Sequence, residues 1–328
     1  MARVHPPRDG QRRIARHQPR EPRPDRQDVP DFKAYDGDRT MTYDLLDAGY
    51  RRSLDLLRRH LSPAVAAGTS GDHRTRHRGS GQEFQDHRPY VPGDDLRRVD
   101  WMAYARTGEP VTRNLRAEED VLLKVLIDTS ASMTDGKLAH AARIAAGVGY
   151  LGLLGGERVQ VIPFADAPDG RRRPERGRAA IPSLLRSLGP LHPSGGTGLR
   201  RALDLALSPG PPSVVLLLSD LLDADEAAPF ARALDPRRHD LRVAHVLSRA
   251  DVEPALSGDL DLEDAETSEL LPLTADAALL DRYRERVTRW CKSIDEAARS
   301  RGARLVRSVS DEPAIDAVRA LLRPDRGG

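Results

Sequence analysis

The stretch VLLKVLIDTSASMTDGKLAHAARIA, residues 121–145, decides the fold of this chain. It begins with a continuous aliphatic run, which is typical of a strand buried on both faces, and continues into small apolar residues that favour a helix. Asp128, Ser130 and Ser132 lie where the strand ends. Their oxygens either cap the following helix or converge on a ligand, and this stretch alone leaves both interpretations open.

The same alternation of aliphatic and helical stretches continues along the rest of the chain. It predicts an α/β fold over residues 121–323, with a doubly wound, mostly parallel sheet covered by helices on both faces. The basic tract GRRRPERGR at 170–178 is expected to be an exposed turn or a short edge strand. The predicted strands are 121–127, 158–164, 213–219, 241–247 and 303–309. The predicted helices are 136–154, 179–188, 198–207, 225–234, 275–301 and 312–322.

Two segments precede this α/β domain. Residues 1–40 are rich in Arg, Pro and Asp and contain few large apolar side chains, so they are predicted to form a disordered basic tail. Residues 41–120 contain a helical stretch followed by a Gly/Ser/Arg loop and a turn. We expect this second segment to pack on the sheet as an N-terminal extension.

Composition excludes several classes of protein. Lys and Arg number 52 against 50 Asp and Glu, and this balance does not favour nucleic acid, which selects a concentrated basic face. A single cysteine, Cys291, excludes an internal disulfide and a cysteine-cage zinc site. No run of about 18 apolar residues is present, so no transmembrane helix is expected. The N-terminus lacks an apolar signal core, which predicts a cytoplasmic protein.

Two further polar residues follow predicted strands or begin helices. Thr197 lies in the glycine-rich loop SGGTGLRRAL, residues 194–203, and Asp220 ends the strand in VVLLLSDLLD, residues 214–223. Ligands of open parallel sheets gather at the carboxyl ends of the strands, where the strand order reverses. Carboxylate and hydroxyl oxygens are hard ligands that suit Mg²⁺ or Mn²⁺. Three independent helix caps explain this pattern less well than one shared site.

The order DTSAS, GGTGL and LLSD resembles the metal-ion-dependent adhesion site of von Willebrand factor A domains, a Rossmann-like fold. The resemblance covers about residues 121–310, and every position of the motif is matched. In that family the ion keeps an open coordination position, which accepts a carboxylate from a partner, and some ligands act through water. The resemblance therefore implies a set of metal ligands: Asp128, Ser130, Ser132, Thr197 and Asp220.

The segment before this domain carries a second resemblance. Residues 79–120, GSGQEFQDHRPYVPGDDLRRVDWMAYARTGEPVTRNLRAEED, together with the α/β domain resemble the bacterial family called domain of unknown function 58. Many members of that family carry transmembrane helices ahead of this region. This sequence shows no such helix, so we expect a soluble member. The features that carry the resemblance are EF at 83–84, RPYVPGDD at 88–95, R-x-x-D-W at 97–101 and AR at 105–106.

The charged turn in this segment has two interpretations. Pro92-Gly93 is a turn dipeptide, and opposite charges cluster after it. We favour a turn held by ion pairs, with Trp101 and Tyr104 anchoring it onto the sheet, over a second ligand site.

These resemblances imply a divalent-metal-dependent protein-binding module of adaptor or chaperone-like function. Relatives are commonly linked with MoxR-type AAA+ ATPases, so the expected partner is such an ATPase or its protein client, bound through a carboxylate. The chain contains no G-x-x-x-x-G-K-[ST] phosphate-binding loop of its own. Another interpretation is that the site binds no ion and the sheet is only a structural scaffold. The intact motif argues against this interpretation.

The alternative from another class is a Mg²⁺-dependent phosphohydrolase that uses Asp128 as nucleophile or metal ligand. Ser130 stands where such enzymes place a second acid, and the sequence shows no suitably placed lysine or general base. The serine-hydrolase elbow G-x-S-x-G is also absent. We therefore predict that the chain is not an enzyme.

Overall fold

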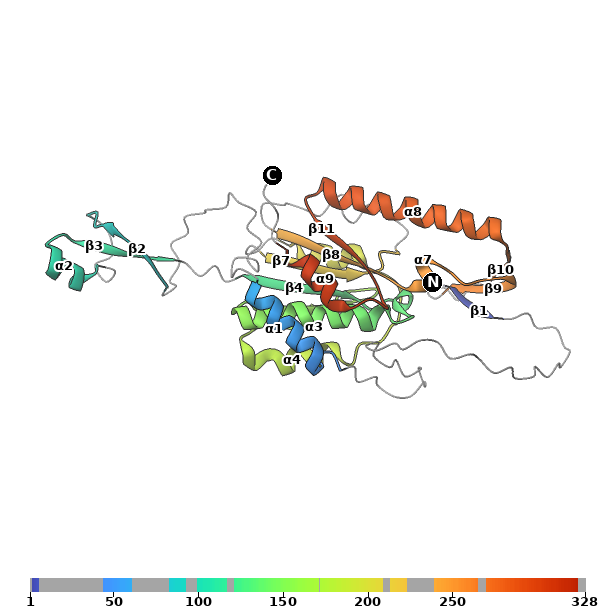
Figure 1. The fold of residues 1–328 in the computed structure, drawn as a ribbon, viewed down its shortest axis with the longest axis horizontal. Helices are drawn as coiled ribbons and strands as arrows, with labels where there is room; N and C mark the ends of the chain where they lie inside the picture. Colours follow the sequence, from blue (N-terminus) through green and yellow to red (C-terminus); the bar gives the residue numbers. More distant parts are fainter. Residues whose placement is uncertain are drawn as a thin grey trace.

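A six-stranded sheet forms the centre of the protein (Figure 1). Its long strands are all parallel, and only the two-residue strand β6 pairs antiparallel with its neighbour. Across the sheet the strands are β11 (Arg304–Val309), β8 (His239–Leu247), β7 (Ser213–Ser219), β4 (Leu122–Asp128), β5 (Arg158–Phe164) and β6 (Glu175–Arg176). The computed structural model describes residues 2–5, 44–60, 83–92, 99–116, 121–170, 172–208, 213–222, 239–264 and 270–323.

The strand order reverses at β4. The chain moves from β4 to β5 on one side and returns to β7 on the other side, so β4 lies between β5 and β7. This is the arrangement that opens a crevice at the carboxyl ends of the strands. The doubly wound, mostly parallel sheet predicted from the sequence is confirmed.

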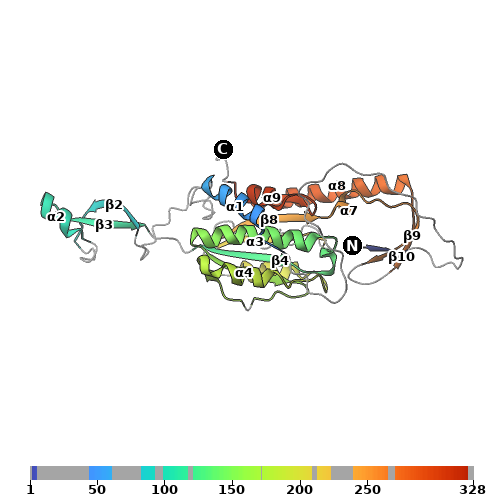
Figure 2. The same cartoon turned by 60° about the horizontal axis from the view of Figure 1, so that its bottom comes forward.

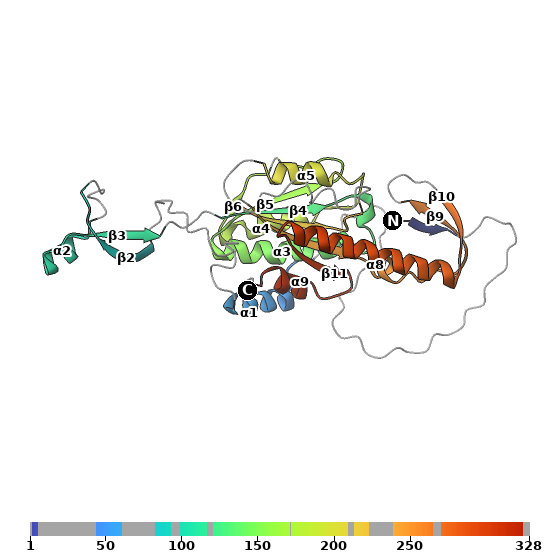
Figure 3. The same cartoon turned by 90° about the horizontal axis from the view of Figure 1, so that it is seen from above.

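Helices cover both faces of this sheet. Leu123, Val125 and Ile127 of β4 join one hydrophobic core, whereas Leu126 joins the other, because alternate side chains of a strand point to opposite faces. Full burial of each such side chain contributes about 1.5–3 kcal/mol. The first core includes residues of α1 (Ala48–His60), α3 (Lys137–Gly155), α4 (Ile181–Leu188) and α9 (Ala314–Leu321). The second includes residues of α5 (Leu199–Ala206) and α8 (Ala277–Ser300), which Figure 3 shows over opposite edges of the sheet.

The predicted strands of the α/β domain agree with the observed ones to within two residues at each end. The basic tract contains the short exposed edge strand β6, as expected. The predicted helix 225–234 lies outside the described residues.

The first helix of the extension, α1, packs against helices α3 and α9. Tyr50 of α1 donates a hydrogen bond from its hydroxyl to the carbonyl of Arg143 in α3, at 3.0 Å. The Tyr50 ring approaches Gly147 so closely that a Cβ there would lie 2.3 Å from the tyrosine oxygen. Asp47 accepts a hydrogen bond from the Tyr50 amide and forms an ion pair with Arg143. Thus a glycine in α3 creates the space in which α1 packs.

A two-stranded antiparallel sheet, which the sequence did not predict, follows in the extension. Strands β2 (Glu83–Pro89) and β3 (Val111–Arg116) pair antiparallel, and α2 (Trp101–Thr107) precedes β3. The prediction that Trp101 and Tyr104 anchor this region onto the sheet is wrong. Trp101 is 58% exposed and Tyr104 is 43% exposed. Their rings contact each other edge to face, with 6.2 Å between the ring centroids.

The charged turn is described only in part. Asp100 accepts hydrogen bonds from the amides of Met102 and Ala103, each at 3.0 Å, and so caps the N-terminus of α2. The neighbouring residues 93–98 lie outside the described ranges. Asp100, one of the residues predicted to form ion pairs, therefore acts as a helix cap. The rest of that prediction lies outside the described residues.

A second antiparallel unit also went unpredicted. Strands β9 (Gly258–Asp264) and β10 (Leu270–Ala275) pair with each other, and β1 (Ala2–His5) pairs with the outer edge of β9. The predicted disorder of residues 1–40 therefore differs from the structure at Ala2–His5, where backbone pairing supplies order that side-chain composition does not reveal. The rest of that tail lies outside the described residues. In Figure 2 the two antiparallel units lie at opposite ends of the α/β domain.

Among the described residues, α3 is long and apolar enough to cross a membrane by length and composition. However, 83% of its apolar window is buried inside the protein, as in the core helix of an α/β domain.

Candidate functional site

Two carboxylates meet at the carboxyl edge of the sheet. Asp128 ends β4, and Asp220 follows the neighbouring strand β7 directly. Both side chains are fully buried. Ser219, the last residue of β7, donates a hydrogen bond from its hydroxyl to Asp128 Oδ2 at 2.6 Å and thus joins the two strand ends.

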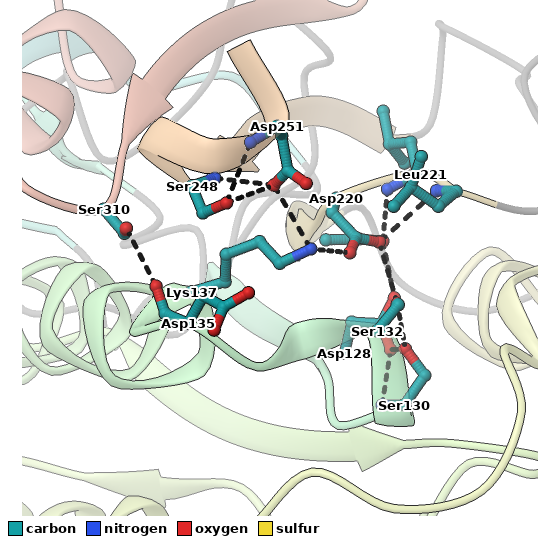
Figure 4. Close-up of polar contacts among 12 residues, drawn as sticks. Asp128, Ser130, Ser132, Asp135, Lys137, Asp220, Leu221, Ser248, Asp251 and Ser310 are labelled. Atoms are coloured by element: carbon teal, nitrogen blue, oxygen red, sulfur yellow. Dashed lines mark hydrogen bonds and ion pairs between the residues drawn. The ribbon is translucent and has the colours of Figure 1, made fainter. Parts of the chain in front are cut away.

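The loop after β4 extends this arrangement. Ser130 donates to Asp128 Oδ1 from its amide at 2.9 Å and from its hydroxyl at 2.7 Å. The Ser130 and Ser132 hydroxyls lie 3.1 Å apart, and Ser132 donates to Asp220 Oδ1 at 3.3 Å. Four of the predicted ligands therefore form one buried chain of oxygens, as Figure 4 shows.

The helix-cap interpretation of these residues is not what the structure shows. The residue at the N-cap of α3 is Gly136, which has no capping side chain, and Ser130 makes no side-chain cap to the short 3₁₀ turn Ala131–Met133. The oxygens of this loop face one another and Asp220 instead. This geometry favours a shared site over local capping.

The fifth predicted ligand, Thr197, belongs to a second loop. Backbone hydrogen bonds join this loop to the loop that follows β4. The amide of Ser194 donates to the Thr129 carbonyl at 2.8 Å, and the amide of Ala131 donates to the Gly195 carbonyl at 2.9 Å. Whereas the other four residues are buried, Thr197 is half-buried and lines an open groove of about 540 Å³. The structure thus brings its loop to the site through backbone hydrogen bonds. The other residues that line this groove are Asp166, Gly198, Arg200, Arg201 and Asp204.

A lysine that the sequence analysis did not place lies inside the site. Lys137, the first residue of α3, is completely buried, and its Nζ lies 2.6 Å from Asp220 Oδ2 and 3.4 Å from Asp251 Oδ2. The prediction that no lysine is suitably placed near the strand-end acids is therefore wrong. The reason is that Lys137 reaches Asp220 across 83 residues of sequence, a contact that spacing does not reveal.

Asp251 is fixed by its own hydrogen bonds. It lies at the start of α7 (Arg249–Val252), beyond the end of β8, and its Oδ2 accepts from the amide and the hydroxyl of Ser248 at 2.7 and 2.8 Å. The Ser248 hydroxyl in turn accepts from the Asp251 amide, which completes a capping box. Asp251 is therefore a rigid third carboxylate beside the oxygen chain.

The electrostatics of the site reflect its burial. Burial, followed by the negative charge of Asp220, raises the pKa of Asp128 to about 6, although hydrogen bonds from Ser219 and Ser130 lower it. Burial also lowers the pKa of His245 to about 3, so this imidazole is neutral near pH 7. Its Nε2 lies 3.1 Å from the Asp220 carbonyl oxygen, and Arg307 Nε donates to its Nδ1 at 3.4 Å. This pairing makes Nε2 the donor to the Asp220 carbonyl.

The backbone is strained beside Asp220. Leu221 is buried and adopts a φ of 57°, a left-handed conformation that costs a residue with a side chain about 1–3 kcal/mol. Its amide donates to the Ser219 hydroxyl at 2.9 Å, and the amide of Leu222 donates to Asp220 Oδ1 at 3.3 Å. Through this turn, the amides of Leu221 and Leu222 donate hydrogen bonds to Ser219 and Asp220.

The donor set fits a hard divalent ion. Its side-chain donors are all oxygens, and paired buried carboxylates are unfavourable unless a cation neutralises them. Within the described ranges, no three His, Cys, Asp or Glu side chains form a metal-binding group by themselves, so an ion here would depend on the serine hydroxyls. Lys137 already neutralises part of the charge at Asp220.

Sequence reasoning missed Ser219, Lys137, His245 and Asp251. A weak signal existed for Lys137, because it is a lysine in the first turn of α3, where acidic residues are preferred, and most residues after it are small or apolar. No comparable local signal marks Asp251, which resembles an ordinary helix-capping residue.

Comparison with known proteins agrees with the second resemblance. The model of the family described as "Protein of unknown function DUF58" matches residues 86–292. The uncharacterized proteins Mb1516 of Mycobacterium bovis and Rv1480 of Mycobacterium tuberculosis are each 30% identical over 267 residues, which cover 78% of this chain and 84% of theirs.

Solved structures show more distant likenesses. BatB from Bacteroides thetaiotaomicron is 17% identical with a TM-score of 0.40, over 61% of this chain and 95% of that one. The von Willebrand factor domain of the pilus tip protein Mfa5 from Porphyromonas gingivalis is 12% identical with a TM-score of 0.34, over 65% and 99% of the two chains. The family model and the mycobacterial relatives identify the chain: it belongs to the DUF58 family.

Proposed function

We propose that this chain is a protein-binding module whose binding depends on a divalent ion, Mg²⁺ or Mn²⁺, at the carboxyl edge of its sheet. The observation that supports this most directly is the buried oxygen chain from Asp128 through Ser130 and Ser132 to Asp220. Such a chain places two carboxylates and two hydroxyls from two loops within reach of one another. Oxygen ligands of this kind are those that Mg²⁺ prefers.

The residues of the proposed site have two roles, which are to bind the ion and to position its ligands. Asp128, Ser130, Ser132 and Asp220 would hold the ion, with Thr197 contributing from the loop beside them. When bound, the ion supplies a positive charge that attracts a partner carboxylate. Ser219 holds Asp128 in place through its 2.6 Å hydrogen bond, so that the first carboxylate is oriented before any ion arrives.

The groove beside Thr197 carries charged side chains of both signs. Arg200 and Arg201 line it, and the two carboxylates that also line it, Asp166 and Asp204, leave its formal charge balanced. Asp166 is already engaged with the Gly196 amide at 3.0 Å, and Arg200 contacts Asp204 at 3.9 Å. We propose that the partner is a MoxR-type AAA+ ATPase or its protein client, and that the chain acts in the cytoplasm as an adaptor or chaperone-like component.

A Mg²⁺-dependent phosphohydrolase remains the second candidate, because Lys137 adds a cation to the strand-end acids as phosphoryl-transfer sites require. Against this candidate, Asp128 is fully buried and each of its carboxylate oxygens accepts a hydrogen bond, which disfavours attack on a substrate. Sustained release of phosphate from a generic phosphate ester, lost in Asp128→Asn, would establish the enzyme.

Calorimetric titration tests the metal site. Wild type should bind Mg²⁺ or Mn²⁺, and Asp128→Ala should not, because one of the two ligating charges is removed. Asp204→Ala is a matched control, since this aspartate is exposed on α5 and outside the oxygen chain. Equal metal affinity in wild type and Asp128→Ala would contradict the assignment.

A pull-down with the ATPase tests the partner. Binding should weaken in EDTA, and in Mg²⁺ it should weaken for Thr197→Ala and Asp220→Ala. Docking through the 92–101 turn or the basic 170–178 tract would respond to salt instead. Binding that survives EDTA and both substitutions, yet falls as salt rises, would transfer the interface to those segments.

A further inference from the structure

Lys137 is an unusual residue to find at the centre of this site. Its side chain has no exposed surface, and such burial of an ammonium group is tolerated only when anions compensate the lost hydration. Two anions do so. Asp220 Oδ2 lies at 2.6 Å from Nζ and Asp251 Oδ2 at 3.4 Å, so the ammonium lies between them and closer to the proposed metal ligand (Figure 4).

The two carboxylates differ in what else holds them. Asp220 uses Oδ1 to accept hydrogen bonds from Ser132 and from the amide of Leu222, and Oδ2 to bind Lys137. Asp251 uses Oδ2 for two hydrogen bonds from Ser248 and has Lys137 as its more distant contact. Asp251 is therefore anchored without the lysine, whereas the charge of Asp220 is balanced by it.

We propose that Lys137 is a built-in competitor of the divalent ion, which binds Asp220 in the absence of metal and is retained by Asp251 when metal is bound. This inference rests on the proposed metal site. The ammonium and a divalent ion repel each other when both are close to Asp220 in a buried, weakly screened site. A lysine side chain is flexible, and Asp251 is near enough to accept the ammonium with only a small movement.

This arrangement makes two residues outside the motif determinants of metal affinity. Lys137 lowers the affinity, because the ion must displace its charge from Asp220. Asp251 raises the affinity, because it stabilises the displaced ammonium. Opposite effects from two residues that touch each other are the signature of competition, and a purely structural ion pair would not produce them.

The experiment compares metal affinity in three variants of the full chain by calorimetric titration with Mg²⁺ and Mn²⁺. Lys137→Met keeps an unbranched side chain that is one atom shorter and removes its charge, and it should bind at least tenfold more tightly than wild type. Asp251→Asn keeps an oxygen that can accept from Ser248 and should bind about tenfold more weakly. Lys292→Met is the matched control, because this lysine is exposed on α8, and its affinity should equal that of wild type.

Thermal unfolding provides a second readout. Lys137→Met should melt at a lower temperature than wild type in EDTA, because buried carboxylates lose their counter-ion, and Mg²⁺ should raise its melting temperature more than that of wild type. If Lys137→Met does not fold, Asp251→Asn still decides the question, since it retains the Lys137–Asp220 pair.

The outcomes separate the two proposals. Metal binding by wild type with unchanged affinity in Lys137→Met or in Asp251→Asn would overturn the competitor role and leave the metal site standing. Binding that is detected only in Lys137→Met would support competition by the lysine and would overturn the proposed function, because the wild-type chain would hold no ion. Absence of binding in wild type and Lys137→Met alike would overturn both.

Discussion

Ser219 and Asp128, which are 91 residues apart in sequence, are joined by a 2.6 Å hydrogen bond across the ends of two neighbouring parallel strands. The serine hydroxyl also accepts a hydrogen bond from the Leu221 amide at 2.9 Å. It therefore links the first carboxylate of the site to the strained turn that carries the second. None of these atoms is exposed to water that could replace the lost bonds.

Ser219→Ala should consequently destabilise the protein. The substitution leaves a buried carboxylate oxygen and a buried amide without this partner, which costs about 1–3 kcal/mol of the free energy of unfolding. Urea unfolding in EDTA measures the loss. Ser183→Ala is the control, because its hydroxyl bonds Glu175 at the exposed surface and its loss should change stability by less than about 0.5 kcal/mol. Equal stability of the two variants would show that the strand-end hydrogen bond is not needed.

His140 should make the stability of the protein sensitive to acid. Burial, together with the nearby charge of Arg143, lowers the pKa of this imidazole from 6.5 to about 4, although Asp311 raises it. Above pH 6.5 the folded and unfolded states are both neutral here. As the pH falls from 6.5 toward 4, the unfolded state takes up a proton that the folded state excludes, so stability decreases by about 2 kcal/mol at pH 5.

His140→Gln tests this effect, since Gln can still bond to Ser308, the partner of His140 at 2.8 Å. Urea unfolding at pH 7.5 and pH 5 should show that the variant loses less stability on acidification than wild type does. Parallel losses in the two proteins would mean that other groups account for the acid sensitivity.

Gly198→Ala should disturb the loop that carries Thr197. A Cβ at this position would lie 2.5 Å from the carbonyl oxygens of both Ala165 and Asp166, and backbone atoms cannot move aside cheaply. We expect a loss of about 1–3 kcal/mol in stability, as for other overpacked positions, together with weaker metal binding. Calorimetry and urea unfolding measure both quantities.

Gly155→Ala is the control for that substitution. A Cβ there would meet its nearest neighbour, Glu157 Oε1, at an ordinary 3.6 Å, and its helical position favours alanine. Stability should stay the same or rise slightly. A similar result for Gly198→Ala would show that the loop can relax around the added methyl group.

Trp101→Ala should leave stability nearly unchanged, within about 0.5 kcal/mol, because the indole is largely exposed on α2. Leu54→Ala is the contrast, since this side chain of α1 is completely buried and its truncation should cost about 2–5 kcal/mol. Thermal unfolding of both variants checks the pair. A large loss for Trp101→Ala would revive the interpretation that the tryptophan anchors the extension.

The parallel sheet could be predicted from the sequence because each long strand is a continuous aliphatic run, which is typical of a strand buried on both faces. The same runs locate the ends of the strands, and hence the carboxylates at those ends. These runs place Asp128 and Asp220 at strand ends, and the resemblance to von Willebrand factor A domains implied that the two belong to one site. Ser130 and Ser132 follow from the loop that joins strand to helix.

Other features depend on contacts that no local pattern contains. The position of Lys137 at a helix N-terminus is unusual, but its two partners, Asp220 and Asp251, are distant in sequence and appear only in the fold. Trp101 was predicted to be an anchor because an aromatic side chain favours burial. Whether another element covers it depends on the arrangement of the elements around it, which the local sequence does not contain. Strand β9 is rich in aspartate and glutamate, a composition that is unfavourable for strands, and this hides its antiparallel pairing with the leucine-rich strand β10.

The position of β7 beside β4 has a consequence during synthesis. On the ribosome, β4, α3 and β5 emerge well before β7, so one edge of an aliphatic strand is left open in the nascent chain. Lys137 and Asp128 are then present without Asp220 and Asp251, the two carboxylates that surround the lysine in the folded protein. The arrival of β7 closes that edge and supplies Asp220, and the segment after β8 supplies Asp251.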